Sequence, residues 1–347
     1  MPKPNRNSLA LIAAACALLS ACEAPVEVSY EDAQAAYDAG DMVLAGEHLV
    51  ALIGSGKDDA QTRLLQARTM LMLGDGNRAL LALEQLPEGA LPAEEMRAMT
   101  AHAQILQGYA HRVAANYESL PDEDFTEEDF RMQLWAFREL DEGEDFDANI
   151  GPALERFPDS VAINTMAGLQ LVENGQPFEA IDYAQIAYAN APESLDTLLL
   201  IGQIEIRRGD LEKALEYYEL AHRFHPHHAL PLANIAGLQL DLGEIGAAGE
   251  TLDAALKDHP DFAFLNFQSA RHLFETGNIE AARLAVEKAR KSFADNIQFI
   301  LLEARIEDKA GNAALAIDLY RLYLNSFGYH RDIEARIAEL EAGATST

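Results

Sequence analysis

The chain has 347 residues, of which 49% are hydrophobic, and its formal net charge is −31. This charge excludes nucleic-acid binding through the overall electrostatic field, because contact with phosphates requires a basic surface. It favours solubility or a basic partner instead. The two cysteines, Cys16 and Cys22, lie near the N-terminus, so the rest of the chain has neither a disulfide nor a catalytic thiol.

Residues 1–22 have the pattern of a secretory leader rather than of a folded element. Lys3 and Arg6 form a basic stretch, which is followed by an apolar run from Leu9 to Leu19. This run is too short to span a bilayer comfortably. We therefore exclude these residues from the predicted fold.

The apolar run is followed by Leu-Ser-Ala-Cys, which ends at Cys22. This ending resembles the lipoprotein box of bacterial leaders. The resemblance implies cleavage before Cys22 and acylation of its thiol, with a signal peptide over 1–21 and a lipidated tether over 22–29. Two or three acyl chains would anchor the protein stably, whereas one would hold it only marginally. An ordinary secretory leader with an incidental cysteine is the alternative.

Glycines recur every 34 residues through the rest of the chain, and prolines follow the same step. Gly143 joins an N-terminal and a C-terminal series with a slip of one or two residues. Because glycine with a positive φ ends one helix and proline stops the next, the pattern predicts helix–turn–helix units. The other members are Gly40, Gly74, Gly108, Gly175, Gly209, Gly243, Gly277 and Gly311, with Pro158, Pro192, Pro226 and Pro260.

Two columns of small residues keep the same phase. Residues seven places before each glycine are all Ala or Gly, and those five places after it are Ala apart from Val113. Small side chains at these places predict that two helices cross at close range. The columns are Ala33, Ala67, Ala101, Ala136, Gly168, Gly202, Ala236, Ala270 and Ala304, and Ala45, Ala79, Val113, Ala148, Ala180, Ala214, Ala248, Ala282 and Ala316.

The stretch over 195–228 carries the fullest version of the pattern. Its key residues are Ile201, Gly202, Gly209, Ala214, Tyr218, Ala221 and Pro226. They resemble the consensus positions of the tetratricopeptide (TPR) repeat, a helix–turn–helix unit of 34 residues. The resemblance implies an all-α fold: an α-α superhelix (TPR solenoid) of about nine repeats plus a C-terminal capping helix.

In chain order, Ser29 is expected to cap the first helix. Divergent TPR-like repeats are expected over 30–158 and regular repeats over 159–328, followed by a capping helix and tail over 329–347. The first four helices are expected near 30–39, 42–53, 59–73 and 76–86.

The fourth unit, near 126–158, is the irregular one and is strongly acidic. Within it, Trp135 is expected in the core. The capping helix, from Arg331 to Leu340, is expected to be apolar on one stripe only, because the exposed end of a solenoid needs a half-polar cap.

No nucleophile–base pair, phosphate loop or metalloprotease motif occurs, so we expect neither enzymatic activity nor a cofactor. One histidine group is a weak candidate for zinc or copper. It coincides with a loop between repeats, where solvated histidines are equally favourable. The group is His222, His225, His227 and His228.

Alignment of the regular repeats to the TPR family places polar and aromatic residues on the concave face formed by the first helices. Three arginines among them are expected to receive a carboxylate or a C-terminal peptide end, or else to pair with acidic residues of adjacent repeats. The predicted groove residues are Gln203, Arg207, Asn234, Phe267, Gln268, Arg271, Phe274 and Arg305.

The resemblance implies a membrane-anchored scaffold for assembling an envelope machine, namely a pilus, a secretion apparatus or an exopolysaccharide exporter. Its partner would be a protein or a peptide segment, and not a nucleic acid. The implied location is the bacterial envelope, at the periplasmic face of the outer membrane. Two alternatives are an adaptor for peptidoglycan-processing enzymes and a metal- or ligand-binding protein that uses the histidine group.

Overall fold

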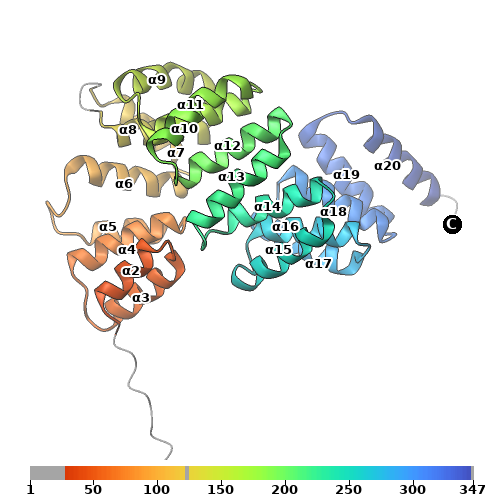
Figure 1. Ribbon diagram of the computed structural model, residues 1–347, viewed down its shortest axis with the longest axis horizontal. Coiled ribbons are helices and arrows are strands. Elements are labelled where there is room, and N and C mark those ends of the chain that lie inside the picture. The colour runs from red at the N-terminus through yellow and green to blue at the C-terminus, as the bar shows by residue number, and fades with distance from the viewer. Residues whose placement is uncertain (1–27, 122–124, 345–347) are drawn as a thin grey trace, which may run out of the picture. The chain divides into compact units, whose positions relative to one another are not determined.

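A computed structural model describes residues 28–121 and 125–344. Within these ranges every regular element is an α-helix, and there are 19 helices (Figure 1). They divide into two compact units, unit 1 up to Asp141 and unit 2 from Glu142 onward. The predicted all-α solenoid is confirmed, whereas Cys22 and the predicted leader lie outside the described residues.

Unit 1 contains three packed helix pairs, and α8 packs against α6 and α7. Neighbouring pairs contact one another in order, as in a solenoid. The pairs are α2 (Tyr30–Asp38) with α3 (Met42–Gly54), α4 (Ala60–Met72) with α5 (Gly76–Glu84), and α6 (Ala93–Leu106) with α7 (Ala110–Glu118); α8 is Glu127–Glu139.

Unit 2 begins with α9 (Gly143–Arg156) and continues as five packed pairs, and α20 (Arg331–Ala344) packs against the last helix. The predicted apolar stripe of this capping helix is buried on the last pair. The pairs are α10 (Val161–Glu173) with α11 (Pro177–Asn190), α12 (Leu195–Arg208) with α13 (Leu211–Phe224), α14 (Ala229–Asp241) with α15 (Ile245–Asp258), α16 (Ala263–Glu275) with α17 (Ile279–Ser292), and α18 (Ile297–Lys309) with α19 (Ala313–Phe327).

The turns follow the predicted glycine series with one exception. The eight regular glycines have φ between 75° and 85°. In the irregular repeat, however, Asp141 has the positive φ of 57°, and Gly143 is the first residue of α9. An aspartate tolerates this conformation better than most residues because its short side chain bonds locally.

This shift of the turn moves the packing register by two residues. Phe146 lies at the inward position and is 1% exposed, whereas Ala148 is exposed. The assignments of Gly143 to the turn and of Ala148 to the small column were therefore wrong. The fourth expected repeat is divided, with α8 in unit 1 and α9 in unit 2.

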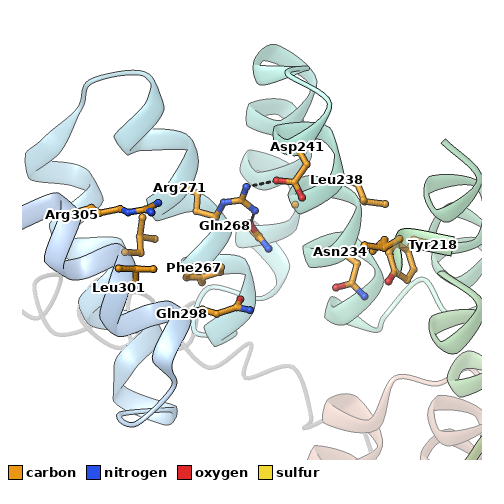
Figure 2. Close-up of a pocket in the computed structure, with 13 residues that line it drawn as sticks. Tyr218, Asn234, Leu238, Asp241, Phe267, Gln268, Arg271, Gln298, Leu301 and Arg305 are labelled. Atoms are coloured by element: carbon orange, nitrogen blue, oxygen red, sulfur yellow. Dashed lines mark hydrogen bonds and ion pairs between the residues drawn. The ribbon is translucent and has the colours of Figure 1, made fainter. Parts of the chain in front are cut away.

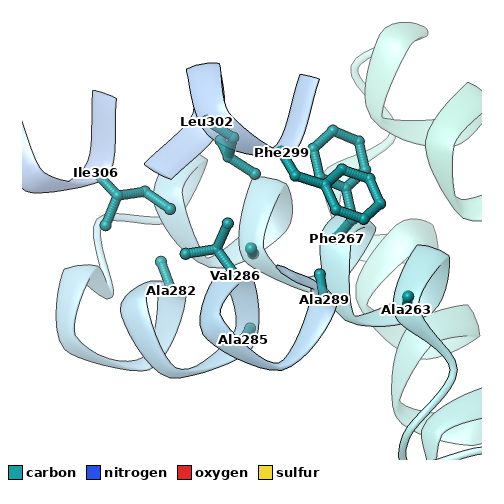
Figure 3. Packing of buried hydrophobic residues seen from close by; sticks show 10 residues of the cluster. Ala263, Phe267, Ala282, Ala285, Val286, Ala289, Phe299, Leu302 and Ile306 are labelled. Atoms are coloured by element: carbon teal, nitrogen blue, oxygen red, sulfur yellow. The ribbon is translucent and has the colours of Figure 1, made fainter. Parts of the chain in front are cut away.

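Elsewhere the small columns mark the places where helices nest. In unit 2, Ala282 and Ala289 of α17 are fully buried, and Figure 3 shows Ala289 near the rings of Phe267 and Phe299 and Ala282 near Ile306. At Gly202, an added Cβ would lie 2.3 Å from Cε1 of Tyr218, so only a hydrogen fits between α12 and α13. The predicted close approach is real at these positions.

Helix ends also follow the predicted signals. Ser29 forms a capping box with Asp32 at the start of α2. Trp135, expected in the core, is only half-buried, because its indole lies at the edge of the packing. There it stacks edge-on with His102 and donates a hydrogen bond to Glu139. Among the described helices, none has the length and apolarity needed to cross a membrane.

Unit 1 contains a buried ion pair that fixes α8 on α6. Asp129 is completely buried and accepts hydrogen bonds from Arg97 at 2.9 and 2.6 Å and from the Thr126 backbone at 3.0 Å. Burial raises the pKa of Asp129, but the bonds from Arg97 and Thr126 outweigh it and hold the pKa below its ordinary value of 3.8. The carboxylate is therefore ionised in the folded protein.

We expect Gly202→Ala to destabilise the protein by about 1–3 kcal/mol, because the new methyl group forces the ring of Tyr218 to move. The matched control is Gly246→Ala. Gly246 is also helical but has no atom within 4 Å of the added Cβ, so this change should stabilise the protein by up to about 1 kcal/mol. Urea denaturation measures both changes, and equal effects would contradict the close-packing argument.

We expect Asp129→Asn to lower the free energy of opening of α6–α8 by roughly 2–4 kcal/mol at neutral pH, since it leaves Arg97 without its buried partner. Because the folded pKa is depressed, this contribution is complete above pH 3.8 and is lost as the pH falls through the lower folded value. Hydrogen exchange should therefore show the variant and wild type converging in acid. The control is Asp58→Asn, whose carboxylate is exposed and whose pairing with Arg63 is screened by solvent, so this change should have a much smaller effect.

Candidate partner-binding groove

Unit 2 has a groove of about 450 Å³ on the face formed by the first helices of its pairs. Its walls come from α12, α14, α16 and α18, with one residue, Tyr218, from the second helix α13 (Figure 2). Each first helix presents this face because its opposite side packs on the second helix of the same pair. The groove is therefore a product of the repeat itself.

Five of the eight predicted groove residues line this groove. The other three do not, because they lie on other faces of their helices. Gln203 and Arg207 are exposed outside it, and Phe274 packs against the hydrophobic core of α16 to α18. The five that do are Asn234, Phe267, Gln268, Arg271 and Arg305.

The floor of the groove is apolar and continuous with the core. Phe267 is 8% exposed and stacks on Phe299, with ring centroids 4.5 Å apart and planes at 21°. Leu238 and Leu302, also largely buried, extend this floor toward α14 and α18. An aliphatic or aromatic side chain of a partner would find apolar atoms here.

Arg271 is neutralised within the groove. Its guanidinium forms an ion pair with Asp241 at 2.5 Å and donates a hydrogen bond to Oε1 of Gln268 at 2.9 Å (Figure 2). The Gln268 amide can lie against α14 because residue 237 is glycine, where an added Cβ would be 2.7 Å from the amide nitrogen. Of the two readings of the arginines, internal pairing holds for Arg271.

Arg305 differs from Arg271. Its side chain is exposed at the α18 wall of the groove, and it makes no hydrogen bond or ion pair with any other residue in the described part of the chain. The three arginines predicted to lie together therefore differ. Arg271 is paired in the groove, Arg305 is unpaired in the groove, and Arg207 lies outside it. Only Arg305 offers a free charge to a ligand in the groove.

Tyr218 is the groove residue that the sequence analysis missed most plainly. Its ring passes Gly202, so it reaches the groove from α13 between two first helices. Burial raises the pKa of its hydroxyl, which therefore stays protonated and able to donate. The pairing of Gly202 with an aromatic residue in the same repeat was the signal that could have revealed it. Asp241, Gln298 and Leu301 gave no comparable signal.

Unit 1 has a groove of its own, of about 620 Å³, which sequence reasoning also missed. Its apolar lining includes the exposed Met72 and the buried Met99, and an ion pair between Arg68 and Glu95 at 2.8 Å also lines it. Burial, helped by the nearby charge of Arg131, lowers the pKa of His102 to about 4, so this side chain is uncharged at neutral pH. Both arginines that line this groove, Arg68 and Arg131, form ion pairs with described residues, so neither resembles the unpaired Arg305.

The histidine group does not form a metal site. His225 donates from Nε2 to the carbonyl of Glu193 at 2.6 Å, and Nδ1 of His228 accepts from the backbone of Leu230 at 3.3 Å. No three potential metal ligands converge anywhere in the described ranges. Two of the four weak candidates, His225 and His228, are instead bonded to backbone groups on either side of Pro226.

Family profiles match the part of the chain that contains the groove. One tetratricopeptide-repeat profile matches residues 165–229 and 267–330, and a second matches residues 205–269. Residues 165–330 are tetratricopeptide repeats. The groove therefore lies entirely within repeats of this family. No curated protein matches the chain in sequence.

Solved structures share the fold at low identity. A chain of the APC/C hetero-tetramer Cut9–Hcn1 aligns with a TM-score of 0.64 and 14% identity, over 98% of this chain and 76% of that one. A tetratricopeptide repeat protein from Parabacteroides merdae gives 0.53 and 16%, over 80% and 96%. PilW, a widely conserved type IV pilus biogenesis factor, gives 0.50 and 17%, over 61% and 98%. These similarities establish the repeat fold.

Proposed function

We propose that this protein is a scaffold that captures a segment of a protein partner in the unit 2 groove. The observation that carries the proposal is the unpaired Arg305 beside an apolar floor. The amides of Asn234 and Gln298 flank the same floor and can bond the backbone of an extended peptide. An acidic side chain or a C-terminal carboxylate of the partner would pair with Arg305.

This chemistry is selective in an acidic protein. A net charge of −31 repels acidic proteins in general, so an acidic group is retained only where a local cation faces it. The apolar floor supplies the larger, less specific part of the binding energy, and Arg305 fixes the register of the bound segment. Binding, not catalysis, is the activity that these residue types support.

The proposed place of action is the cell envelope, with the chain held by acyl groups on Cys22 at the periplasmic face of the outer membrane. The sequence around Cys22 supports this proposal, as does the shared repeat fold of PilW, a pilus biogenesis factor. An anchored scaffold meets its partner at a high local concentration, so a modest groove affinity is sufficient. Assembly of an envelope machine such as a pilus is the role we favour.

We expect Arg305→Glu to weaken partner capture at least about tenfold, because it replaces a charge-assisted bond with repulsion. Stability should change by no more than about 0.5 kcal/mol, since Arg305 has no partner among the described residues. The measurement is photo-crosslinking from Gln298 followed by mass spectrometry. The matched control is Arg207→Glu, an exposed arginine outside the groove. Undiminished capture by the Arg305 variant would rule out this groove.

We expect Cys22→Ser to move the protein from the membrane fraction to the soluble fraction, because the thiol that carries the diacylglycerol is gone. Fractionation with immunoblotting measures this, and Cys16→Ser, inside the leader, is the control that should stay membrane-bound. If the Cys22 variant remained with the membrane, the proposed lipid anchor would be wrong.

A further inference from the structure

The outer face of α3 is unusually apolar. Val43 is 63% exposed, Val50 is 62% exposed and Leu44 is 39% exposed, and all three lie on the side opposite the buried Leu49 and Leu52. Between them stands Glu47, the one acidic residue of the helix. No described residue covers this face, so it exposes aliphatic side chains to whatever surrounds the protein.

Two equivalent second helices, α13 and α17, carry more charge on their exposed sides, although others, such as α19 with Leu315 and Leu322, also expose aliphatic side chains. The exposed side of α13 carries Glu212, Glu216, Glu219 and Arg223. On α17 a single exposed leucine is surrounded by Glu287, Lys288 and Lys291. A solvated helix of a strongly acidic protein keeps its outer face charged, as these two do. The outer face of α3 is therefore poorer in charge than those of α13 and α17.

The position of α3 indicates what the face meets. Helix α2 begins at Tyr30, eight residues after Cys22, and α3 is its packed partner (Figure 1). Eight residues span at most roughly 26–29 Å when fully extended, so an anchor at Cys22 keeps α3 close to a bilayer surface. Glu47 is the one acidic residue of α3, so repulsion between this helix and anionic headgroups is limited to a single carboxylate.

We propose that the outer face of α3, formed by Val43, Leu44 and Val50, rests in the interfacial layer of the membrane. This inference rests on the proposed lipid anchor. The aliphatic side chains enter about 5–10 Å into the boundary between headgroups and acyl chains, as interfacial helices do. The anchor supplies the local concentration, so three side chains are enough to fix the orientation of unit 1 relative to the bilayer.

The test uses a tryptophan probe. Trp135→Phe removes the single native tryptophan, and Val50→Trp then places a probe on the outer face of α3. Leu81→Trp in the same background is the matched control, because Leu81 is 56% exposed on the next second helix, α5. Both proteins, starting at residue 23 with an N-terminal histidine tag, are attached to vesicles of phosphatidylethanolamine and phosphatidylglycerol that contain a nickel-chelating lipid.

For Val50→Trp we expect a blue-shifted emission on the vesicles, quenching by brominated acyl chains and several-fold weaker quenching by acrylamide. For Leu81→Trp the emission should stay that of a solvated indole. Equal acrylamide quenching of the two probes on vesicles would overturn the inference. A blue shift of the Val50→Trp probe without vesicles would also overturn it, because another segment or a second copy would then cover the face.

The tag keeps this result separate from the proposed anchor. The wild-type chain expressed with its own leader is floated with vesicles in parallel, and failure to float counts against acylation of Cys22 alone. The tagged proteins report on α3 whatever the outcome of flotation. As a second readout, Val43→Asp with Val50→Asp should abolish vesicle protection of α3 amides in hydrogen exchange while unit 2 exchange stays unchanged.

Discussion

The structure depends on how closely paired helices approach one another. Where α12 meets α13, the ring of Tyr218 occupies the space that a side chain at Gly202 would need. In α17 the same role falls to fully buried alanines, of which Ala289 lies near the rings of Phe267 and Phe299 (Figure 3). Large side chains on one helix and near-absent ones on the other produce dense packing without a conventional central core. Each pair then presents the next pair with the same surface, so the chain can grow lengthwise.

The groove of unit 2 follows from that packing rather than from a separate device. Because Gly202 is bare, Tyr218 passes through to the groove, and because residue 237 is glycine, the Gln268 amide lies directly on α14. The floor uses Phe267, which also stacks in the core, so the binding surface and the stabilising surface share side chains. Arg305 is the exposed cation at the groove wall, and it forms no hydrogen bond or ion pair with any described residue.

Repeating features were readable from the sequence, and pairwise ones were not. The glycine period predicted the turns because a positive φ is a local requirement, and it failed only where Asp141 met the same requirement without glycine. Five groove residues were predicted because helical phase carries over between repeats. The pairing of Arg271 with Asp241 joins positions on different helices. Because charged residues follow no period, the sequence left both ligand binding and internal pairing open for this arginine. The backbone bonds of His225 and His228 are likewise pairwise contacts that no sequence period announces.

The bridge between Arg271 and Asp241 has a consequence for how a ligand would enter the groove. A carboxylate that approaches Arg271 must compete with Asp241, which is half exposed and ready to rebind. Entry there is an exchange of one anion for another, so little electrostatic energy is gained. A carboxylate would therefore gain less by binding at Arg271 than by binding at Arg305, which has no described anion to displace.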